Sequence, residues 1–223
     1  MKIDILSLFS GYFEGPLTES ILKRAIDKGL IEINHVDIRD FCTDKHRQVD
    51  DRPYGGGPGM VLMPEPTTKA IKACKTSESK TIYLSPQGKP LTSKLAKDLS
   101  NEKHLILLCG HYEGIDERVI ESEVDLEVSI GDYVLTNGCL AAIVLIDALS
   151  RFVPGVLGHE NSNDQDSFEN DLLDCPHYTR PQVFDGRSVP EVLLSGNHKE
   201  INRWREKAAY KQTLHKRPDL IKN

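Results

Sequence analysis

The sequence predicts an α/β fold: a parallel β-sheet with helices on both faces, followed by a small, mainly helical C-terminal domain. Two observations lead to this prediction. Between residues 3 and 150, short apolar segments typical of strands alternate with segments typical of helices. Residues 196–223 then contain eight Lys and Arg against three Asp and Glu, a local charge of +5 in a chain of net charge −6.

The first segments predict a β-α-β unit. Residues 3–9 form an apolar stretch with Asp4 inside it, as in a short buried strand. Residues 16–28 are amphipathic and end at Gly29, and residues 31–38 alternate as a strand does. The same alternation continues along the chain, with helices predicted at residues 65–73, 93–99, 116–122 and 140–150 and strands at residues 81–84, 105–108 and 126–130.

Glycine-containing loops follow three of the predicted strands. Strands that alternate with helices favour a parallel sheet, and in such sheets ligands bind beyond the carboxyl ends of the strands. The loops at residues 85–88, 110–114 and 129–135 leave strands at that edge. Glycine lets the backbone approach a ligand closely, and Tyr112, Glu113, Asp132 and Tyr133 are side chains that orient a ligand rather than fill a core. We therefore predict a binding site in these loops.

The periodicity fails from residue 152 to residue 174, where Gly, Asn, Ser and Asp are frequent, so we expect an exposed, mobile linker. A helix then begins at Asn197, because Asn is a good N-cap and Glu200 occupies the capping-box position. Ile201, Trp204 and Ala208 share the apolar face of this helix, and Lys199, Arg203 and Lys207 line the opposite side.

Several protein classes are not supported by the sequence. The longest uncharged apolar run, residues 139–146, is far shorter than the roughly 18 residues that a membrane-spanning helix needs, and the N-terminus lacks a signal-peptide cleavage site. We therefore expect a cytoplasmic protein with no membrane partner. The five cysteines include no Cys-x-x-Cys pair, which is typical of small buried side chains in a reducing compartment. Neither His-Glu-x-x-His nor a compact Cys/His cluster is present, so zinc is not predicted.

The loop at residues 50–60 contains four glycines and two prolines. It lacks the Gly-Lys-Ser/Thr ending of a P-loop and the Gly-x-Gly-x-x-Gly of a dinucleotide-binding fold, so neither an NTPase nor a dehydrogenase is supported. It is either a tight surface loop or a rigid shaped surface. His46, Arg47 and Arg52 either contact a phosphate backbone or are solvated.

Taken together, these motifs resemble the bacterial tRNA (guanine-N1)-methyltransferase family of the trefoil-knotted SPOUT superfamily. The similarity covers essentially the whole chain. Its motifs are Asp-Arg-Pro-Tyr-Gly-Gly-Gly-Pro-Gly-Met at 51–60, Tyr-Leu-Ser-Pro-Gln-Gly at 83–88, Cys-Gly-His-Tyr-Glu-Gly-Ile-Asp-Glu-Arg-Val at 109–119, Ser-Ile-Gly-Asp-Tyr-Val-Leu at 129–135, Ser-Arg-Phe at 150–152 with residues 154–160, Asp-Ser-Phe at 166–168, Leu-Asp-Cys-Pro-His-Tyr-Thr-Arg-Pro at 173–181 and Leu-Ser-Gly-Asn-His at 194–198.

The resemblance implies a homodimer that transfers a methyl group from S-adenosylmethionine to N1 of guanosine 37 of tRNA, 3′ of the anticodon. It implies a SPOUT domain with a trefoil knot at residues 1–160, a flexible linker at 161–174 and a basic helical tRNA-binding domain at 175–223. The implied cofactor residues are Tyr83, Leu84, Ser85, Pro86, Gln87, Gly88, Gly110, Tyr112, Glu113, Ser129, Ile130, Gly131, Asp132, Tyr133, Val134, Leu135, Asn137 and Gly138.

The family's catalytic residues correspond to Asp166 and Arg151. Guanine N1 carries a proton at neutral pH, so a carboxylate is needed as general base, and a guanidinium aimed at O6 stabilises the negative charge that develops there. From composition alone, Asp166 would be a solvated acid and Arg151 a charge that complements a helix C-terminus. The family's magnesium requirement implies Mg²⁺ near Glu113 or Asp166. In the family, Asp166 of one subunit faces the cofactor loops of the other.

The implied tRNA contacts lie mainly in the second half of the chain. They are His46, Arg47, Arg52, Ser167, His177, Arg180, Arg203 and Arg205. The sequence departs from many relatives at Asn137-Gly138-Cys139, where they have Gly-Gly-Glu, and at His111, where some have Arg; we expect Asn137 to adopt the left-handed backbone of a glycine. Two alternatives remain: a SPOUT enzyme that methylates another RNA position, and a non-catalytic tRNA-binding dimer.

Overall fold

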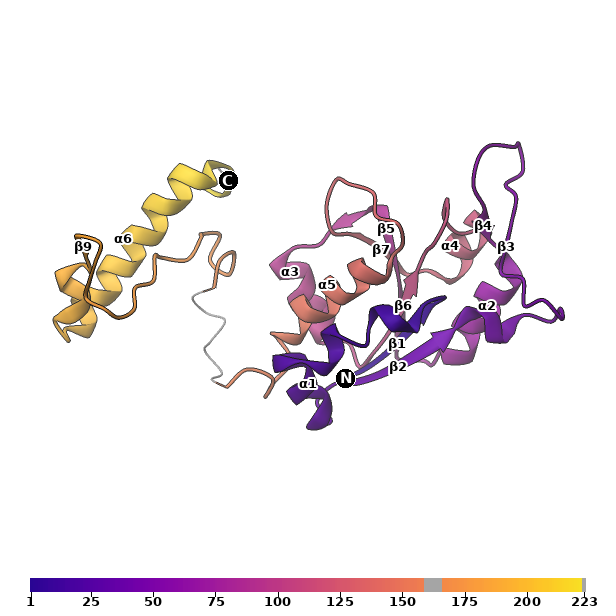
Figure 1. The fold of residues 1–223 in the computed structure, drawn as a ribbon, viewed down its shortest axis with the longest axis horizontal. Helices are drawn as coiled ribbons and strands as arrows, with labels where there is room; N and C mark the ends of the chain where they lie inside the picture. The colour runs from indigo at the N-terminus through magenta and orange to yellow at the C-terminus, as the bar shows by residue number, and fades with distance from the viewer. Residues whose placement is uncertain (159–165, 222–223) are drawn as a thin grey trace. The chain divides into compact units, whose positions relative to one another are not determined.

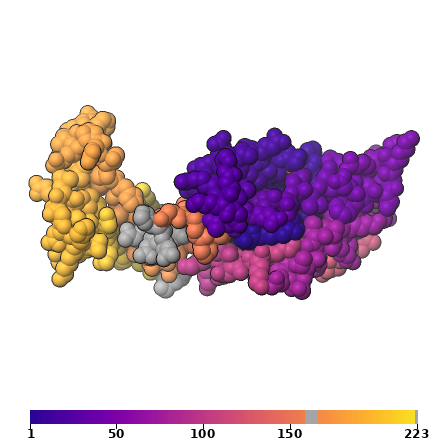
Figure 2. All heavy atoms as spheres, turned by 90° about the horizontal axis from the view of Figure 1, so that it is seen from below, coloured from indigo at the N-terminus to yellow at the C-terminus, as the bar shows by residue number. Residues whose placement is uncertain are grey.

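The structure is a computed structural model that describes residues 1–158 and 166–221 (Figure 1). The chain forms two compact units, Met1–Glu160 and Asn161–Asn223, and each is described by itself. In the space-filling view, the N-terminal residues in indigo and the residues near 100–130 in magenta pack into one body, which is the first unit (Figure 2).

The first unit is built on a five-stranded sheet in which every pairing is parallel. The strands are β1 (Lys2–Ser7), β2 (Glu32–Asp37), β5 (Ser79–Pro90), β6 (His104–Cys109) and β7 (Leu126–Ser129), in the order β2-β1-β6-β5-β7. The central strand β6 is buried over all six residues, as expected of a parallel strand covered on both faces. The predicted α/β class is confirmed; the trefoil knot stays a prediction.

Helices cover both faces of this sheet, as the alternating sequence pattern predicted (Figure 1). The helices are α1 (Ser20–Asp27), α2 (Pro64–Cys74), α3 (Ser93–Ser100), α4 (Glu117–Glu123) and α5 (Cys139–Ser150). Buried side chains of α1, α3 and α5 share one core with alternate strand residues such as Leu105 and Leu107. Buried side chains of α2 and α4 share a second core with Ile106 and Leu108. Successive side chains of β6 therefore pack into different cores, because they point to opposite faces of the sheet.

None of the described helices is both long and apolar enough to cross a membrane. The most apolar of them, α5, has 12 residues. All five cysteines are free thiols, and Cys109, Cys139 and Cys175 are buried.

Strand β5 differs from the prediction. The sequence predicted a strand that ends at Leu84 and a loop at residues 85–88, but β5 continues to Pro90. Its pairing with β7 shifts register between Leu84 and Lys89, so residues 85–88 form an irregularity within the strand. At Gly88 an added Cβ would lie 2.4 Å from the backbone of Glu127 and Val128, so only glycine fits this crossing.

Short elements complete the first unit. The predicted helix at residues 16–28 is split into a 3-10 turn, Pro16–Thr18, and α1, because Ser20 has a positive φ of 52°. Two further 3-10 turns lie at Ser10–Tyr12 and Ile38–Phe41. The glycine-rich loop is closed by the antiparallel pair β3 (Asp50–Asp51) and β4 (Val61–Leu62).

The second unit contains the longest helix, α6 (His198–Lys216). Asn197 caps it as predicted, since its Oδ1 accepts a hydrogen bond from the Glu200 N–H at 3.4 Å. Ile201 is buried and Arg203 exposed, which agrees with the predicted faces. The remaining elements are the hairpin β8 (Val183–Phe184) and β9 (Arg187–Ser188) and the 3-10 turns Glu191–Leu194 and Pro218–Leu220.

Only part of the predicted linker lies among the described residues. Positions 161–165 lie outside the described residues. Residues 166–174 are held against α6: the Leu173 N–H donates to Oγ1 of Thr213 at 2.8 Å, and Nε2 of Gln212 donates to the Asp174 carbonyl at 3.0 Å. The partners lie about 40 positions further along the chain, so local periodicity could not reveal this packing.

Buried polar groups gather near the start of the central strands. The Asp4 carboxylate accepts a hydrogen bond from Nδ2 of Asn34 at 3.1 Å, lies 2.8 Å from Nε2 of His104 and pairs with Lys2 at 3.0 Å. Burial by itself raises the pKa of Asp4, but the hydrogen bonds from Lys2, Asn34 and His104 outweigh it and leave the pKa lowered. Asp4 is therefore ionised in the folded protein.

We predict that Asp4→Asn lowers the free energy of unfolding at neutral pH by about 2 kcal/mol, because a buried charge-assisted network is lost. The pKa of Asp4 is lower in the folded protein than its usual value of 3.8, so the ionised carboxylate stabilises the fold above that pH. This stabilisation is lost as the pH falls through the folded pKa. The difference between variant and wild type in urea unfolding should therefore shrink at acidic pH. Asp27→Asn, which removes only an exposed ion pair with Lys23, is the control and should change little.

Candidate functional site

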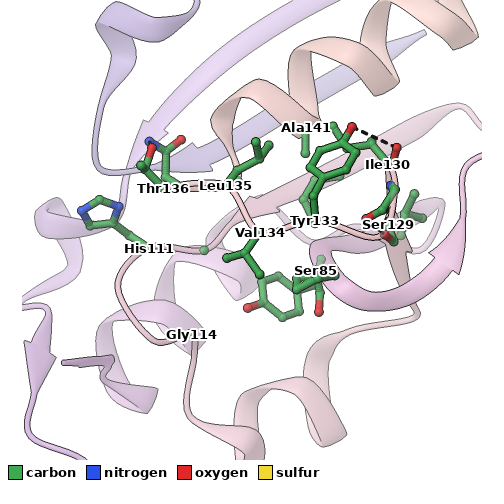
Figure 3. Close-up of a pocket in the computed structure, with 18 of the residues that line it drawn as sticks. Ser85, His111, Gly114, Ser129, Ile130, Tyr133, Val134, Leu135, Thr136 and Ala141 are labelled. Atoms are coloured by element: carbon green, nitrogen blue, oxygen red, sulfur yellow. Dashed lines mark hydrogen bonds between the residues drawn. The ribbon is translucent and has the colours of Figure 1, made fainter. Parts of the chain in front are cut away.

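A cavity opens beyond the carboxyl ends of β6 and β7 and beside the irregular part of β5, where the sequence predicted a site (Figure 3). Most of the predicted cofactor residues line it: Tyr83, Leu84, Ser85, Pro86, Gly110, Tyr112, Glu113, Ser129, Ile130, Gly131, Tyr133, Val134, Leu135, Asn137 and Gly138. Gln87, Gly88 and Asp132 are not among its lining residues. Five residues outside the predicted set also line it, namely His111, Gly114, Val128, Thr136 and Ala141.

The loop after β6 and the loop before α5 are joined directly at the cavity. The Gly138 N–H donates to the Gly110 carbonyl at 2.8 Å, and His111 pairs with Asn137 in an isolated antiparallel bridge. An added Cβ at Gly138 would lie 3.0 Å from Cα of Cys109 and from the Gly110 nitrogen. The absence of a side chain at Gly138 therefore lets the two loops meet.

A second turn, at residues 129–133, is rigid. Oγ of Ser129 accepts from the Gly131 N–H at 3.2 Å and donates to the Gly131 carbonyl at 3.0 Å. The Tyr133 hydroxyl donates to the Ile130 carbonyl at 3.2 Å, the bond drawn in Figure 3. Gly131 has a φ of +152°, and an added Cβ there would lie 2.4 Å from Cε1 of Tyr133. The Tyr133 ring thus packs over a residue that only glycine can occupy.

The Tyr83 ring packs against the Gly110 loop. Its ring lies 3.0 Å from where a Cβ of Gly110 would be. Burial raises the pKa of Tyr83 to about 12, and the nearby Glu127 and Glu117 carboxylates add to the effect. The phenol therefore stays neutral at physiological pH and offers a hydroxyl rather than a charge to the site.

The glycine-rich loop at residues 50–60 packs against the Glu113 loop. The Glu113 N–H donates to the Met60 carbonyl at 3.0 Å. Gly59 has a φ of +81°, and an added Cβ there would lie 2.4 Å from Oε1 of Glu113. Tyr112 has a positive φ of 59°, which is uncommon for an aromatic residue. Glu113 is exposed at the cavity edge. The Gly59 turn packs against its side chain.

A second cavity lies in the second unit, between residues 166–175 and α6. Asp166, predicted as catalytic, and Arg205, predicted to contact tRNA, both line it. Asp166 is half-buried there. Ser167 acts locally, since its Oγ accepts from the Asp174 N–H at 3.0 Å. Arg151, the other predicted catalytic residue, belongs to the first unit, where it directly follows α5 as its C-cap.

The other predicted tRNA contacts are exposed. His46, Arg47 and Arg52 lie in the first unit, and His177, Arg180 and Arg203 in the second. Three of them already have partners: Arg47 pairs with Asp40, Arg203 lies 3.4 Å from Glu200, and Nε2 of His177 lies 2.6 Å from Oδ2 of Asp174. The exposed ion pairs of Arg47 and Arg203 contribute little to stability, so these two side chains can exchange partners readily.

Potential metal ligands gather at one place in the described part of the chain. Asp174, Cys175 and His177 offer ligand atoms within 4.8 Å of one another. Neither Glu113 nor Asp166, the predicted magnesium ligands, belongs to this group. The sequence showed no zinc-binding motif here; the three ligand atoms come together because Asp174 and His177 are in contact.

Comparison with known proteins identifies the family of this chain. A family model described as tRNA (Guanine-1)-methyltransferase TrmD matches residues 1–223. The chain belongs to this family. A tRNA (guanine-N(1)-)-methyltransferase of Protochlamydia amoebophila is 66% identical over 221 residues, covering 99% of this chain and 100% of the relative. One from Carboxydothermus hydrogenoformans is 59% identical over 222 residues, covering 100% and 88%. One from Chlamydia pneumoniae is 60% identical over 223 residues, but this chain spans only 62% of its length.

The structure of Asn137 differs from the expectation. Asn137 does not adopt a left-handed backbone; instead its Oδ1 accepts a hydrogen bond from the Cys139 N–H at 2.8 Å. Asn137 is buried. Its side chain therefore satisfies an N–H group at the start of α5 that would otherwise lack an acceptor.

We predict that Asn137→Ala destabilises the first unit by about 1 kcal/mol, because the Cys139 N–H loses its acceptor. Asn137→Asp keeps an oxygen at the same place, next to a helix N-terminus that favours negative charge, and should lose less. The midpoint of urea unfolding, followed by circular dichroism, measures both. Equal midpoints for Asn137→Ala and wild type would show that this cap contributes nothing.

Proposed function

We propose that this protein methylates N1 of guanosine 37 of tRNA, with S-adenosylmethionine as the methyl donor. The observation that carries the proposal is the match of the family model to the whole chain, residues 1–223. The relatives at 59% to 66% identity are named as tRNA guanine-N1 methyltransferases. The cavity at the strand ends agrees with such chemistry, because it offers close backbone approach and apolar walls together.

The donor pocket is the cavity of the first unit. Gly110 and Gly138 let the Tyr83 ring and the two loops pack closely beside the cavity, and the walls of Val134, Leu135 and Ala141 suit an apolar heterocycle. Backbone N–H and carbonyl groups of the 129–138 loop would bind the polar edges of the donor. When bound, the donor supplies a methyl group on a positively charged sulfur. The rigid turn at Gly131 and Tyr133 orients it without reorganisation.

The target base must first lose a proton. Asp166 is the proposed general base that takes it from guanine N1, and Arg151 would stabilise the negative charge that develops on O6. Asp166 belongs to a segment that hydrogen bonds fix to α6 through Leu173 and Thr213. A base held in this way needs the second unit to be folded, which supports a role for that unit in catalysis as well as in tRNA binding.

We propose that the active form is a homodimer in which Asp166 of one subunit serves the donor cavity of the other. Helix α5 supports this, because its own apolar side chains lie on all its faces. Two of them, Leu140 and Val144, are each more than 40% exposed. An all-round apolar helix is normally buried. A second copy of α5 would cover these side chains beside the cavity that Ala141 lines.

Magnesium dependence is a further part of the proposal. Glu113 and Asp166 each offer a carboxylate, and Mg²⁺ is usually bound through one or two carboxylates plus water. Activity measured after treatment with EDTA and again after addition of Mg²⁺ tests this separately. Full activity in EDTA would remove the metal from the proposal and leave the general-base role of Asp166 intact.

We predict that Asp166→Asn reduces the rate of methyl transfer to tRNA by at least about 100-fold, since general-base catalysis typically contributes 10²–10⁴-fold. Binding of S-adenosylmethionine, measured by calorimetry, should change little because Asp166 belongs to the other unit. Asp171→Asn is the matched control: Asp171 is exposed, and Asn tolerates its φ of 55°.

Mass analysis of nucleosides from the reacted tRNA identifies the product. A methylated nucleoside other than N1-methylguanosine would favour an enzyme that acts on another RNA position. Wild-type turnover by Asp166→Asn would exclude the general-base role.

We predict that Val144→Asp converts the protein to a monomer and abolishes methylation, because a charge on the exposed face of α5 cannot be buried in an interface without a partner. Sedimentation velocity and the tRNA methylation rate measure the two effects. Leu214→Asp, at an exposed apolar position of α6, is the control. A fully active monomeric Val144→Asp variant would contradict a site shared between subunits.

A further inference from the structure

Three side chains of the second unit bring together three different kinds of metal ligand. We call them the 174–177 cluster: Asp174, Cys175 and His177. A carboxylate oxygen, a thiol sulfur and an imidazole nitrogen lie within 4.8 Å of one another. Around a tetrahedral zinc ion, with bonds of about 2.0–2.3 Å, neighbouring ligand atoms lie roughly 3.3–3.8 Å apart. Small side-chain rotations therefore suffice for the cluster to surround one cation.

The backbone that carries two of these ligands is held in place by neighbouring side chains. Nε2 of Gln212 donates to the Asp174 carbonyl at 3.0 Å, and the Asp174 N–H donates to Oγ of Ser167 at 3.0 Å. Oδ1 of Asp174 accepts from the Cys175 N–H at 2.6 Å, and Cys175 is buried. Binding of a cation would thus order little that is not already ordered, which favours affinity.

The third ligand, His177, is the movable one. Its side chain is 77% exposed, so the imidazole can rotate without disturbing a core. Its Nε2 lies 2.6 Å from Oδ2 of Asp174, and the two atoms share a proton at this distance. Both atoms are lone-pair donors once that proton leaves. A divalent cation can take the place of the proton between them.

The second cavity provides room for the rest of a coordination sphere. Asp174 and Cys175 both line this cavity, which has a volume of about 300 Å³. One water molecule occupies about 30 Å³ in the liquid, so several waters fit beside the two ligands. A zinc ion with three protein ligands keeps its fourth position for water. The cluster therefore offers three ligands and access for the fourth.

The types of ligand select the metal. Thiolate and imidazole favour zinc, whereas magnesium prefers oxygen ligands, and of the three side chains only Asp174 supplies oxygen. Burial and the neighbouring Asp174 carboxylate raise the pKa of the Cys175 thiol, so the cation has to displace the thiol proton. A coordinating metal such as zinc does this, because it stabilises the thiolate directly.

We propose that Asp174, Cys175 and His177 bind a zinc ion, with water from the second cavity as the fourth ligand. This site is separate from the proposed magnesium ligands, since neither Glu113 nor Asp166 belongs to the cluster. The proposal does not rest on methyl transfer, because it concerns only side chains that the fold of the second unit brings together. A bound zinc ion would tie residues 174–177 to one another.

Cobalt(II) is the probe for the test, because it takes the same tetrahedral ligands as zinc and absorbs light. The full chain is freed of metal with EDTA, transferred to buffer without chelator and titrated with Co²⁺. We expect one Co²⁺ per chain, with the visible absorption of a tetrahedral site and the near-ultraviolet band of a thiolate–cobalt bond. Zinc should then displace the cobalt and abolish both absorptions, since zinc binds such sites more tightly.

Two variants identify the ligands. Cys175→Ser should lose the thiolate band, while Cys42→Ser, at a free cysteine outside the cluster, should keep it. His177→Gln should bind Co²⁺ and Zn²⁺ at least about tenfold more weakly, since loss of an outer partner of a metal ligand already costs 10–100-fold. His215→Gln, at an exposed position of α6, is the matched control and should bind like wild type.

Urea unfolding separates metal binding from damage to the fold. Without metal, His177→Gln should unfold at about the wild-type midpoint, because its side chain is exposed. Saturating Zn²⁺ should raise the midpoint of wild type and of His215→Gln, but raise that of His177→Gln far less, since a ligand of the folded state stabilises it by mass action. If Cys175→Ser does not fold, this comparison decides alone.

Three results would each overturn the proposal. The first is wild-type protein without a tetrahedral cobalt spectrum. The second is equal zinc affinity of wild type and His177→Gln. The third is a thiolate band that persists in Cys175→Ser and disappears in Cys42→Ser, because the metal would then be held at a different cysteine.

Discussion

The direct contact between the loop after β6 and the loop before α5 is the constraint on which the cavity depends. Gly138 donates to the Gly110 carbonyl at 2.8 Å, and neither side of this contact has space for a side chain. The contact joins segments that are almost 30 residues apart in the chain. Because both loops leave buried elements, the sheet and α5 hold the contact rigidly, and the cavity is already formed in a single folded unit.

Much of this arrangement could be predicted from the sequence, since its causes are local. The alternation of strand and helix patterns, the cap at Asn197 and the glycines beyond the strand ends are each visible within a few residues. The parts that differ depend on distant partners. Residues 85–88 stay in the sheet because the β7 backbone crosses Gly88, and Asn137 uses its side chain rather than its backbone because the Cys139 N–H needs an acceptor. His111 gave no local signal of its own, because its ring packs against Phe9, which follows β1 in a distant part of the sequence.

The residues that stabilise the sheet and the residues that shape the cavity lie near opposite ends of the strands. The buried Asp4 and His104, with Asn34 as a further hydrogen-bond partner, lie at or near the start of their strands, while the cavity is formed near the other ends. The turn at Gly131 needs no support from carboxylates, since hydroxyl and backbone atoms make its hydrogen bonds. The turn can therefore keep its shape over a pH range in which carboxylates change charge.

The hydroxyl of Thr213 is fully buried in α6 and binds the segment that leads back to Asp166. Removal of the chain from about this residue onward would leave the whole first unit intact. It would also release the carboxylate that the proposed chemistry requires. A proteolytic cut late in α6 would thus yield a fragment with an intact cavity but without a fixed Asp166, and under the proposed function such a fragment would bind the methyl donor without transferring the methyl group.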